Sequence, residues 1–306
     1  MPNYQGVWSL SEQYQNAGGW PSNSNRALFG GGWPGGSNSN VIDFIKISSG
    51  GTAKDFGDLT TGRRTVGAAS NSVRGVFVGG NSSNVIDYVT IAAKGNAVDF
   101  GDALSTRSDF AASSNNTRCV FSGGTGDVIE YFTIATTGNS LDFGDLTVSN
   151  RQQMASCASD TRGLFAGGEY AGSYRNVIDR VTIATTGNAA DHGDLSVARN
   201  ALAACSNLTR AVFAGGQDGS GDLNVIDFRS ISSGGTASDF GDLTTAARTY
   251  GTGTAGATKG LFAMASTGNI ESITISTAGN SVDFADQTVG RYGAGALSDT
   301  NSSSQP

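Results

Sequence analysis

The sequence predicts an all-β protein, a six-bladed β-propeller with four antiparallel strands in each blade. A segment of the form Arg-x-(Leu/Val)-Phe-x-Gly-Gly recurs with its Phe at spacings of 48, 44, 44, 48 and 49 residues, the length of a propeller blade. Each period holds four strand-like pieces and lacks the apolar pattern of helices. Glycine supplies 45 of the 306 residues and proline only 4, which indicates many tight turns in a folded chain.

The innermost strand of each blade is predicted from segments that begin with Arg and continue in small residues. Ala, Gly, Ser and Thr dominate them, which suits the strands nearest the axis, where six blades converge and space is least. These segments are 64–70, 107–113, 151–158, 199–206, 248–255 and 291–298.

The second strand is the recurring segment itself, and the third strand follows it. The second strands carry Phe29, Phe77, Phe121, Phe165, Phe213 and Phe262, and the last copy has lost its Arg and Gly-Gly. The third strands are 40–47, 84–91, 127–134, 176–183, 224–231 and a divergent 268–275. In the first of them Ile42 and Phe44 alternate with Val41 and Ile45, so both faces are apolar, as a sheet between neighbouring sheets requires.

The fourth strand-like piece is Asp-Phe-Gly-Asp. It begins at Asp55, Asp99, Asp142 and Asp239, while His192 replaces the Phe in one blade and Ala285 replaces the Gly in another. The glycines between the third and fourth pieces supply positive-φ positions for hairpin turns. Calcium is an open alternative at the Asp-x-Gly-Asp turns, although each turn offers two carboxylates and calcium prefers a larger set of oxygens.

The two ends of the repeat predict how the ring closes. The chain enters the repeat at a second strand, 26–31, and leaves it on a small-residue strand, 291–298. We therefore expect the last strand to complete the first blade, which leaves no open sheet edge between the first and last blades.

Together these pieces resemble the kelch repeat over roughly residues 23–298. An Arg-led inner strand, a second strand ending in Gly-Gly and a third strand with a central aromatic residue are the features in common. Kelch repeats usually carry Trp near the outer strand, where this chain has Phe56, Phe100, Phe143, Phe240 and Phe284. The resemblance implies a kelch-type propeller at 23–298, between an N-terminal docking segment, 1–22, and a polar tail, 299–306.

Charged residues that recur in every blade are expected to maintain the blade, because a catalytic site occurs once. An Arg–carboxylate pair, or a carboxylate that accepts turn amides, is the expected arrangement. The carboxylates are Asp43, Asp87, Glu130, Asp179, Asp227 and Glu271.

Nothing else in the sequence predicts catalysis, a cofactor or a metal site. His192, the single histidine, replaces a repeated Phe, and no nucleophile–base arrangement surrounds it. Cys119, Cys157 and Cys205 lack metal-site spacing and are expected to be free and buried. The protein is predicted not to be an enzyme.

Charge and hydropathy restrict the partners. A net charge of −7 without any Lys/Arg cluster argues against nucleic acid. No apolar run approaches the length of a membrane helix, so no membrane insertion is expected.

The segment 1–22 interrupts the repeat and concentrates aromatic residues. It is too short to form a core, and the two expectations are packing on the propeller or docking to a partner through Trp8, Leu10, Tyr14 and Trp20. From Gly6 to Pro21 it resembles a short segment of bacteriophage virion proteins, especially tail-fibre and tail-associated chains.

Two functions remain open from the sequence. The first is a non-enzymatic virion protein, part of a tail or capsid, whose candidate partners are other virion proteins, a host receptor or glycan, and further copies of itself in a homo-oligomer. The second is a bacterial carbohydrate- or protein-binding kelch domain. In both, loops after the Gly-Gly strands, 35–40, 81–84, 168–175 and 216–223, would contact the ligand, with Tyr170 and Tyr174 as candidate contacts.

Overall fold

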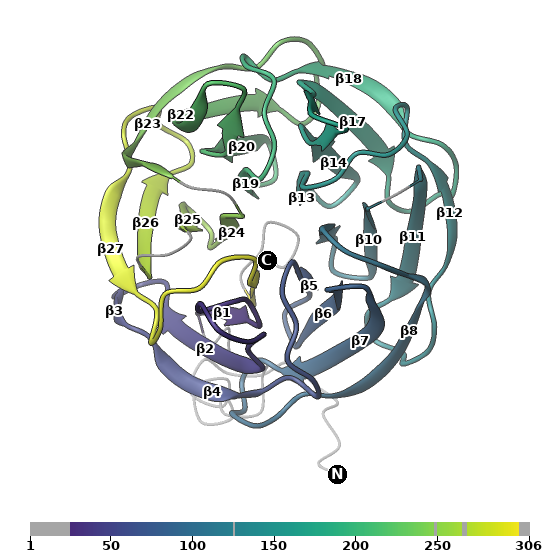
Figure 1. Ribbon diagram of the computed structural model, residues 1–306, viewed down its shortest axis with the longest axis vertical. Helices are drawn as coiled ribbons and strands as arrows, with labels where there is room; N and C mark the ends of the chain where they lie inside the picture. Colours follow the sequence, from purple (N-terminus) through teal and green to yellow (C-terminus); the bar gives the residue numbers. More distant parts are fainter. Residues whose placement is uncertain (1–24, 125, 248–249, 265–267, 300–306) are drawn as a thin grey trace, which may run out of the picture.

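The structure is a six-bladed β-propeller, as the sequence predicts. The computed structural model describes residues 25–124, 126–247, 250–264 and 268–299. Six of the sheets that these residues form are the blades, each with four antiparallel strands, arranged as a ring around a central channel, and the described residues contain no helix (Figure 1).

Each blade runs from an inner strand at the channel to an outer strand at the rim. In chain order and from inside outward, the blades are β28 (Gly295–Ser298), β1 (Arg26–Gly30), β2 (Val41–Lys46) and β4 (Lys54–Asp58); β5 (Gly67–Ser70), β6 (Arg74–Gly80), β7 (Ser83–Thr90) and β8 (Val98–Arg107); β9 (Phe110–Ser114), β10 (Arg118–Gly123), β11 (Val128–Thr133) and β12 (Leu141–Asp145); β13 (Ala155–Ala158), β14 (Arg162–Ala166), β17 (Val177–Thr182) and β18 (Ala190–Asp194); β19 (Ala203–Ser206), β20 (Arg210–Ala214), β22 (Gly221–Ser230) and β23 (Ser238–Ala247); β24 (Thr252–Ala255), β25 (Lys259–Ala263), β26 (Asn269–Thr274) and β27 (Val282–Asp286).

The ring closes in the first blade, and the predicted closure is confirmed. Strand β28 pairs with β1, so that Leu297 lies opposite Leu28, and both side chains are buried in one apolar cluster. Just beyond β28, the Asp299 carboxylate accepts a hydrogen bond from the Arg26 backbone N–H at 3.0 Å. On the outside of the same junction, the short strand β3 (Gly51–Thr52) pairs in parallel with β27. The last blade therefore contacts the first at the outer edge of the ring through β3, in addition to the closure by β28 inside the first blade.

The inner strands meet closely enough to require small residues. A Cβ atom added to Gly253 would lie 2.3 Å from the carbonyl oxygen of Ala204 in the neighbouring blade. Serine hydroxyls link several inner strands to the preceding blade: Ser70 Oγ donates to Ser298 O at 2.7 Å and Ser114 Oγ donates to Ser70 O at 2.7 Å. The prediction of small residues around the axis is confirmed.

The Asp-Phe-Gly-Asp motif lies in the outer strands, which confirms its prediction as a strand; the calcium alternative described it as a turn, and that description is wrong. Its Phe is buried, as at Phe56, and its Gly allows the next blade to approach. A Cβ on Gly57 would lie 2.3 Å from the carbonyl oxygen of Gly95 in the second blade, whose N–H donates to Phe56 O at 2.9 Å. The same hydrogen bond recurs at the next four junctions: Gly138 to Phe100, Gly187 to Phe143, Gly235 to His192 and Gly279 to Phe240. Backbone hydrogen bonds thus link successive blades at the rim.

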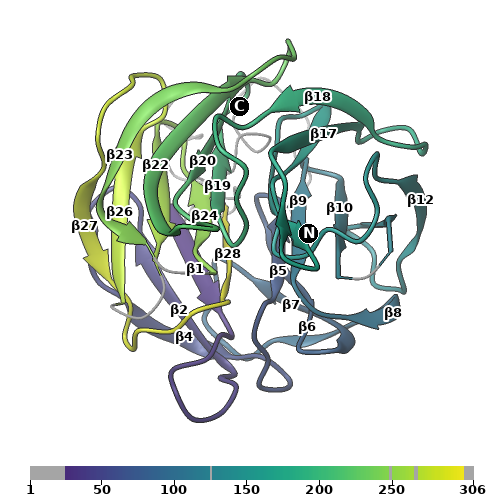
Figure 2. The same ribbon diagram turned by 45° about the horizontal axis from the view of Figure 1, so that its top comes forward.

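The segments between strands gather on two opposite faces. We call the face that carries the links from second to third strand and from fourth strand to the next blade, such as 31–40 and 59–66, the mouth face. The other, which carries links such as 71–73 and 91–97, is the turn face. Hydrogen bonds join the segments within each face, from Gly32 N to Arg63 O at 2.7 Å and from Ile91 N to Val73 O at 2.9 Å. In Figure 2 the dark purple loop between β1 and β2 projects beyond its blade on the mouth face.

Candidate functional site

Buried Arg–carboxylate pairs recur around the ring, and the structure confirms the predicted pairing in five blades. The pairs are Arg63–Asp87, Arg107–Glu130, Arg151–Asp179, Arg199–Asp227 and Arg291–Asp43. In the second blade the paired residue is Arg63, so the assignment of this role to Arg64 is wrong. The arginines also precede the inner strands by a few residues instead of beginning them, because β5 starts at Gly67.

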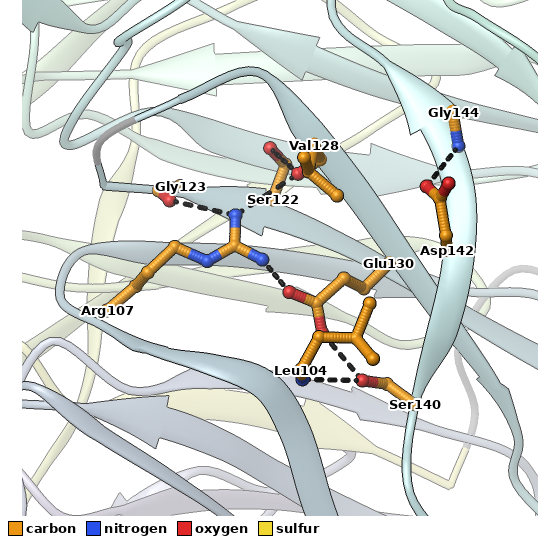
Figure 3. Close-up of polar contacts among 9 residues, drawn as sticks. All are labelled: Leu104, Arg107, Ser122, Gly123, Val128, Glu130, Ser140, Asp142 and Gly144. Carbon is orange, nitrogen blue, oxygen red and sulfur yellow. Dashed lines mark hydrogen bonds and ion pairs between the residues drawn. The ribbon is translucent and has the colours of Figure 1, made fainter.

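Each pair ties the segment before an inner strand to its own blade. In Figure 3 the Arg107 guanidinium contacts the Glu130 carboxylate and donates to the carbonyl oxygens of Gly123 and Val128 at 3.4 and 3.2 Å. Glu130 also accepts hydrogen bonds from Leu104 N at 2.9 Å and Ser140 Oγ at 2.6 Å. Burial lowers the pKa of the guanidinium, which nevertheless stays charged because arginine does not lose its proton in proteins. These are the contacts of a structural ion pair.

At the mouth of the channel, equivalent positions of the six blades carry different side chains. Two residues after the Arg that precedes each inner strand, the backbone is left-handed, with φ between 53° and 69°. One such residue from each blade surrounds the channel entrance: Thr65, Asp109, Gln153, Ala201, Tyr250 and Gly293. With the inner strands they line a hollow of about 90 Å³. The repeat thus fixes the backbone of this rim while the side chains differ, which is the arrangement expected of a recognition surface on a rigid scaffold.

Aromatic rings occupy one side of the mouth. The ring of Tyr292 lies 4.9 Å from that of Trp33 and stacks on that of Tyr250 at 6.2 Å, measured between centroids. The Arg64 guanidinium is 6.0 Å from the Trp33 ring. Because the aromatic faces and a cation are half-exposed here, this side of the mouth can contact both an apolar surface and a hydrogen-bonding ligand.

Polar side chains continue the cluster across the mouth. Gln153 Nε2 donates to Tyr250 Oη at 2.7 Å, and Asn200 Nδ2 donates to Gln153 Oε1 at 2.8 Å. The Oδ1 atom of Asn200 is buried and accepts no hydrogen bond within the described chain. Burial raises the pKa of Tyr250 to about 12, with the Asp109 charge adding to the shift, so the phenol is a neutral donor at physiological pH.

Asp109 is the one carboxylate among the six left-handed residues at the channel entrance. Burial raises its pKa to about 6, the nearby Arg64 opposes this shift and Glu169 adds to it. None of the hydrogen bonds among the described residues ends on its side-chain oxygens, whereas its backbone N–H donates to Thr65 Oγ1 at 3.2 Å. A ligand hydroxyl or amide could supply the missing donor.

Three long loops stand around this mouth, in the first, fourth and fifth blades. They are 31–40, 167–176 and 215–224, and they account for the longer periods of 48, 48 and 49 residues. Each is fixed to the segment before the inner strand of its blade by a backbone bridge: Trp33 to Tyr292, Gln152 to Glu169, and Asn200 to Gln217. The loops are therefore anchored beside the rim.

The structure places the predicted ligand contacts Tyr170 and Tyr174 on one of these loops but on different sides of it. The hairpin of β15 (Glu169–Tyr170) and β16 (Ser173–Tyr174) pairs Tyr170 with Ser173 and Tyr174 with Glu169. Since neighbouring residues of a strand point to opposite faces, the two rings do not form one surface. Tyr170 is 45% exposed, while Tyr174 is half-buried beside Gly219 of the fifth blade.

The predicted docking residues Trp8, Leu10, Tyr14 and Trp20 lie outside the described residues. Their segment joins the propeller at Arg26, where β1 begins on the turn face. Asp299, beside Arg26, is on the same face. Whatever segment 1–22 contacts, its attachment point is on the face opposite the mouth.

The cysteine thiols and the histidine side chain are buried. The three cysteines are free, and burial raises the pKa of each thiol, that of Cys157 to about 12. His192 is buried, with Nε2 3.0 Å from Ser230 O. Within residues 25–299, apart from the gaps given above, no group of three or more His, Cys, Asp or Glu side chains is arranged to hold a metal ion. The described residues also contain no membrane-spanning helix.

The aromatic and polar side chains at the mouth, such as Tyr250, Tyr292 and Gln153, were not predicted from the sequence because they lie far apart in the chain and belong to no motif. A signal was nevertheless present: the position two residues after each Arg holds six different residue types inside an otherwise regular repeat. No protein-family model and no curated protein matches the chain.

Proposed function

We propose that this protein is a non-enzymatic structural or host-attachment component of a bacteriophage virion, built on a kelch-type propeller. One observation carries the proposal: the two faces of the ring are differentiated. The turn face carries the attachment point of the aromatic segment 1–22, and the mouth face carries the long loops and the unequal rim. A protein that docks through one face and presents the opposite face to a partner needs this division.

The kelch and virion assignments rest on the sequence resemblances. The motif of an Arg-led inner strand, Phe-x-Gly-Gly and Asn-Val-Ile-Asp supports the first, and the run from Gly6 to Pro21 supports the second. In this proposal, Trp8, Leu10, Tyr14 and Trp20 dock to another virion protein, since aromatic anchors dominate such interfaces. The mouth face then points away from the particle, toward a host receptor or glycan.

Co-purification with particles tests this proposal. Virions from a lysate of cells that produce the protein are banded on a density gradient and their proteins are identified by mass spectrometry. The protein is expected in the band at a fixed ratio to the major virion proteins, and its absence from washed particles would contradict the proposal. Replacing Trp8 and Tyr14 by Ala is expected to abolish incorporation, whereas the matched pair Tyr170→Ala and Tyr174→Ala on the mouth face is expected to leave it unchanged.

A carbohydrate- or protein-binding kelch domain of a bacterium is the second candidate. The observation that favours it is the aromatic and polar mouth, where the Tyr292 ring contacts Trp33 and stacks on Tyr250, on which the Asp109 charge acts. A glycan array probed with the labelled protein discriminates the two. Array binding that is lost in Tyr292→Ala, together with absence from virions, would favour the second candidate. Array binding unaffected by the loop changes Tyr170→Ala and Tyr174→Ala would remove those tyrosines from the site.

A further inference from the structure

The outer wall of the propeller follows a regular pattern of side-chain stacking. At the start of the second strand in five blades, Arg or Lys lies over an aromatic ring, and in four of them that ring belongs to the third strand and packs edge-on against the Phe of the fourth. In the third blade, Arg118 lies 4.3 Å from the Tyr131 ring, whose centroid is 5.7 Å from that of Phe143. The equivalent stacks are Arg26, Phe44 and Phe56; Arg74, Tyr88 and Phe100; and Arg210, Phe228 and Phe240.

The same Phe also packs against an apolar side chain of the next blade. Phe100, for example, lies 4.9 Å from Phe132, between ring centroids. At the corresponding position of the third strand, the first, second, fourth and sixth blades have the buried apolar residues Ile45, Val89, Val181 and Ile273. These contacts form the apolar seal between neighbouring blades at the rim.

The junction of the fourth and fifth blades departs from this pattern at three positions together. Arg180 replaces the aromatic ring of the third strand, His192 replaces the Phe of the fourth, and Arg229 replaces the apolar residue of the next blade. The second-strand Arg162 remains. Three guanidinium groups and the only histidine of the chain therefore lie near one another, and all three arginines act electrostatically on His192.

The charges at this junction are not neutralised by protein carboxylates. Among the described residues, no Asp or Glu oxygen lies within 4.0 Å of Arg162, Arg180 or Arg229, whereas five other arginines are paired in this way. Arg162 donates to Ile231 O and Ser232 O at 2.8 and 2.7 Å, and Arg229 Nε donates to Ser233 O at 3.1 Å. The Arg180 guanidinium makes no hydrogen bond within the described part of the chain.

A hollow of about 170 Å³ lies beside two of these arginines, Arg162 and Arg180, and its lining residues all belong to the fourth blade. Its polar lining consists of donors: Arg162, Arg180, the Thr182 hydroxyl and Asn188, whose Oδ1 already accepts a hydrogen bond from Asp145 N at 3.2 Å. Among the residues that the structure describes, no acidic side chain lines it. Ala190 borders the hollow where other blades carry the larger exposed residues Val98, Leu141 and Val282. At roughly 30 Å³ per water molecule, the space takes a small anion with some of its hydration.

We propose that this hollow, on the outer wall of the fourth blade, binds a phosphate or sulfate group. Guanidinium groups bind such oxyanions through paired, charge-assisted hydrogen bonds, and the unpaired Arg180 has its donors available for them. A bound dianion also reduces the repulsion between the Arg162 and Arg180 guanidinium groups. A free ion and an ester on a larger ligand share this chemistry, and the site is independent of the proposed virion role.

The lone histidine gives a direct readout. The imidazole resonances of His192 are followed by NMR at pH 7.5 during titration with sodium phosphate and, separately, sodium sulfate, each against sodium chloride at matched ionic strength. A saturable shift with phosphate, sulfate or both is expected, and none with chloride. A sulfate response equal to that of phosphate indicates recognition of the shared tetrahedral oxyanion, and a preference identifies the ester class. Linear, unsaturated shifts identical to those in chloride would overturn the proposal.

Matched variants locate the site. Arg180→Phe restores the residue found in the fifth blade, so it is expected to fold, and to weaken phosphate binding about tenfold or more, since a hydrogen bond to a charged group is lost. Arg180→Gln serves the same purpose if the Phe variant does not fold. Lys54→Ala removes one exposed positive charge from the first blade and is expected to bind phosphate as the wild type does. Equal weakening by Lys54→Ala and Arg180→Phe would show a general charge effect and contradict the site.

Discussion

The turn face and the mouth face of this ring are built from the same repeat but differ in how strictly they keep it. On the turn face, the second-strand arginines reach to the next blade and donate to equivalent carbonyl oxygens, as from Arg26 to Ile91 O at 2.8 Å and from Arg118 to Ile183 O at 2.9 Å. On the mouth face, one backbone position holds a different side chain in every blade. In a repeat protein, contacts that recur hold the blades together. A fixed backbone with variable side chains marks the surface available for binding.

The largest expected effect comes from breaking the closure. Deleting residues 291–306 removes β28, the Arg291–Asp43 pair and the Leu297 side chain, and it exposes the edge of β1. We expect the loss of cooperative unfolding at the native midpoint and association through the open edge, because unpaired strand edges are templates for pairing. Thermal unfolding and light scattering after size-exclusion chromatography measure both. A deletion variant with the midpoint and the oligomeric state of the full chain would show that the ring does not depend on this strand.

Breaking one recurring ion pair is expected to have the next largest effect. Asp179→Ala leaves the fully buried Arg151 without its carboxylate, which costs about 3–5 kcal/mol of unfolding free energy. Urea denaturation measures the loss. The exposed Asp160→Ala is the control, with an expected change within about 0.5 kcal/mol.

A double variant separates the cost of leaving one buried charge unpaired from the contribution of the ion pair itself. Replacing Arg151 by Met and Asp179 by Leu removes both charges at once, and we expect most of the stability to return, since apolar replacement of a buried pair is often neutral. If the double variant is as unstable as Asp179→Ala, the pair contributes more than mutual neutralisation.

The backbone contacts between blades at the outer edge of the ring are tested by adding one methyl group. In Gly144→Ala the new Cβ would lie 2.5 Å from the carbonyl oxygen of Gly187, at a φ of 144°. Backbone strain and overpacking together are expected to cost about 1–3 kcal/mol. Gly36→Ala, on a mouth-face loop with no atom within 4 Å of the added Cβ, is the matched control and is expected to be neutral. Equal effects of the two substitutions in urea denaturation would refute the assignment of this Gly to inter-blade contact.

The smallest effect is expected on the mouth face itself. The pKa of Asp109 is raised from 3.8 to about 6 on folding, so the folded protein binds this proton more tightly than the unfolded chain does. Stability is therefore lost as pH rises from about 4 to about 6, and Asp109→Asn removes that loss. We expect the variant to be more stable than the wild type by about 1 kcal/mol at pH 8, reduced for partial exposure, with the gain absent at pH 3.5. A gain of the same size at both pH values would contradict the assigned cause.

Much of the fold was predictable because the repeat constrains it several times over. The period, the small inner strands and the split first blade each required only that equivalent positions, such as Phe29 and Phe77, be aligned. The choice of Arg64 over Arg63 failed because adjacent arginines satisfy the same pattern, and only burial against Asp87 distinguishes them. Asp-Phe-Gly-Asp could be predicted as a strand, but the calcium alternative treated it as a turn because Gly and Asp favour turns, whereas here the Gly permits close approach of a neighbouring blade.

The mouth could not be predicted in the same way. Tyr250 and Tyr292 stack only because the ring brings the sixth and first blades together, and Trp33 reaches them from a loop of variable length. The anionic rim residue Asp109 lies beside Arg64, a second-blade residue with no sequence relation to it. Periodicity predicts where such residues can be placed, but their combination follows from closure of the ring and from loop anchoring.

The division of labour between the two faces is tested most directly by labelling single cysteines on assembled particles. The native cysteines are buried, so a new thiol at Tyr170→Cys on the mouth face or at Val73→Cys on the turn face reports its own accessibility; the wild-type residues are 45% and 46% exposed. Both variants are expected to react with a maleimide reagent at similar rates as free protein. On virions, the account predicts unchanged labelling at position 170 and protection at position 73. Protection at 170 with free access at 73 would contradict it.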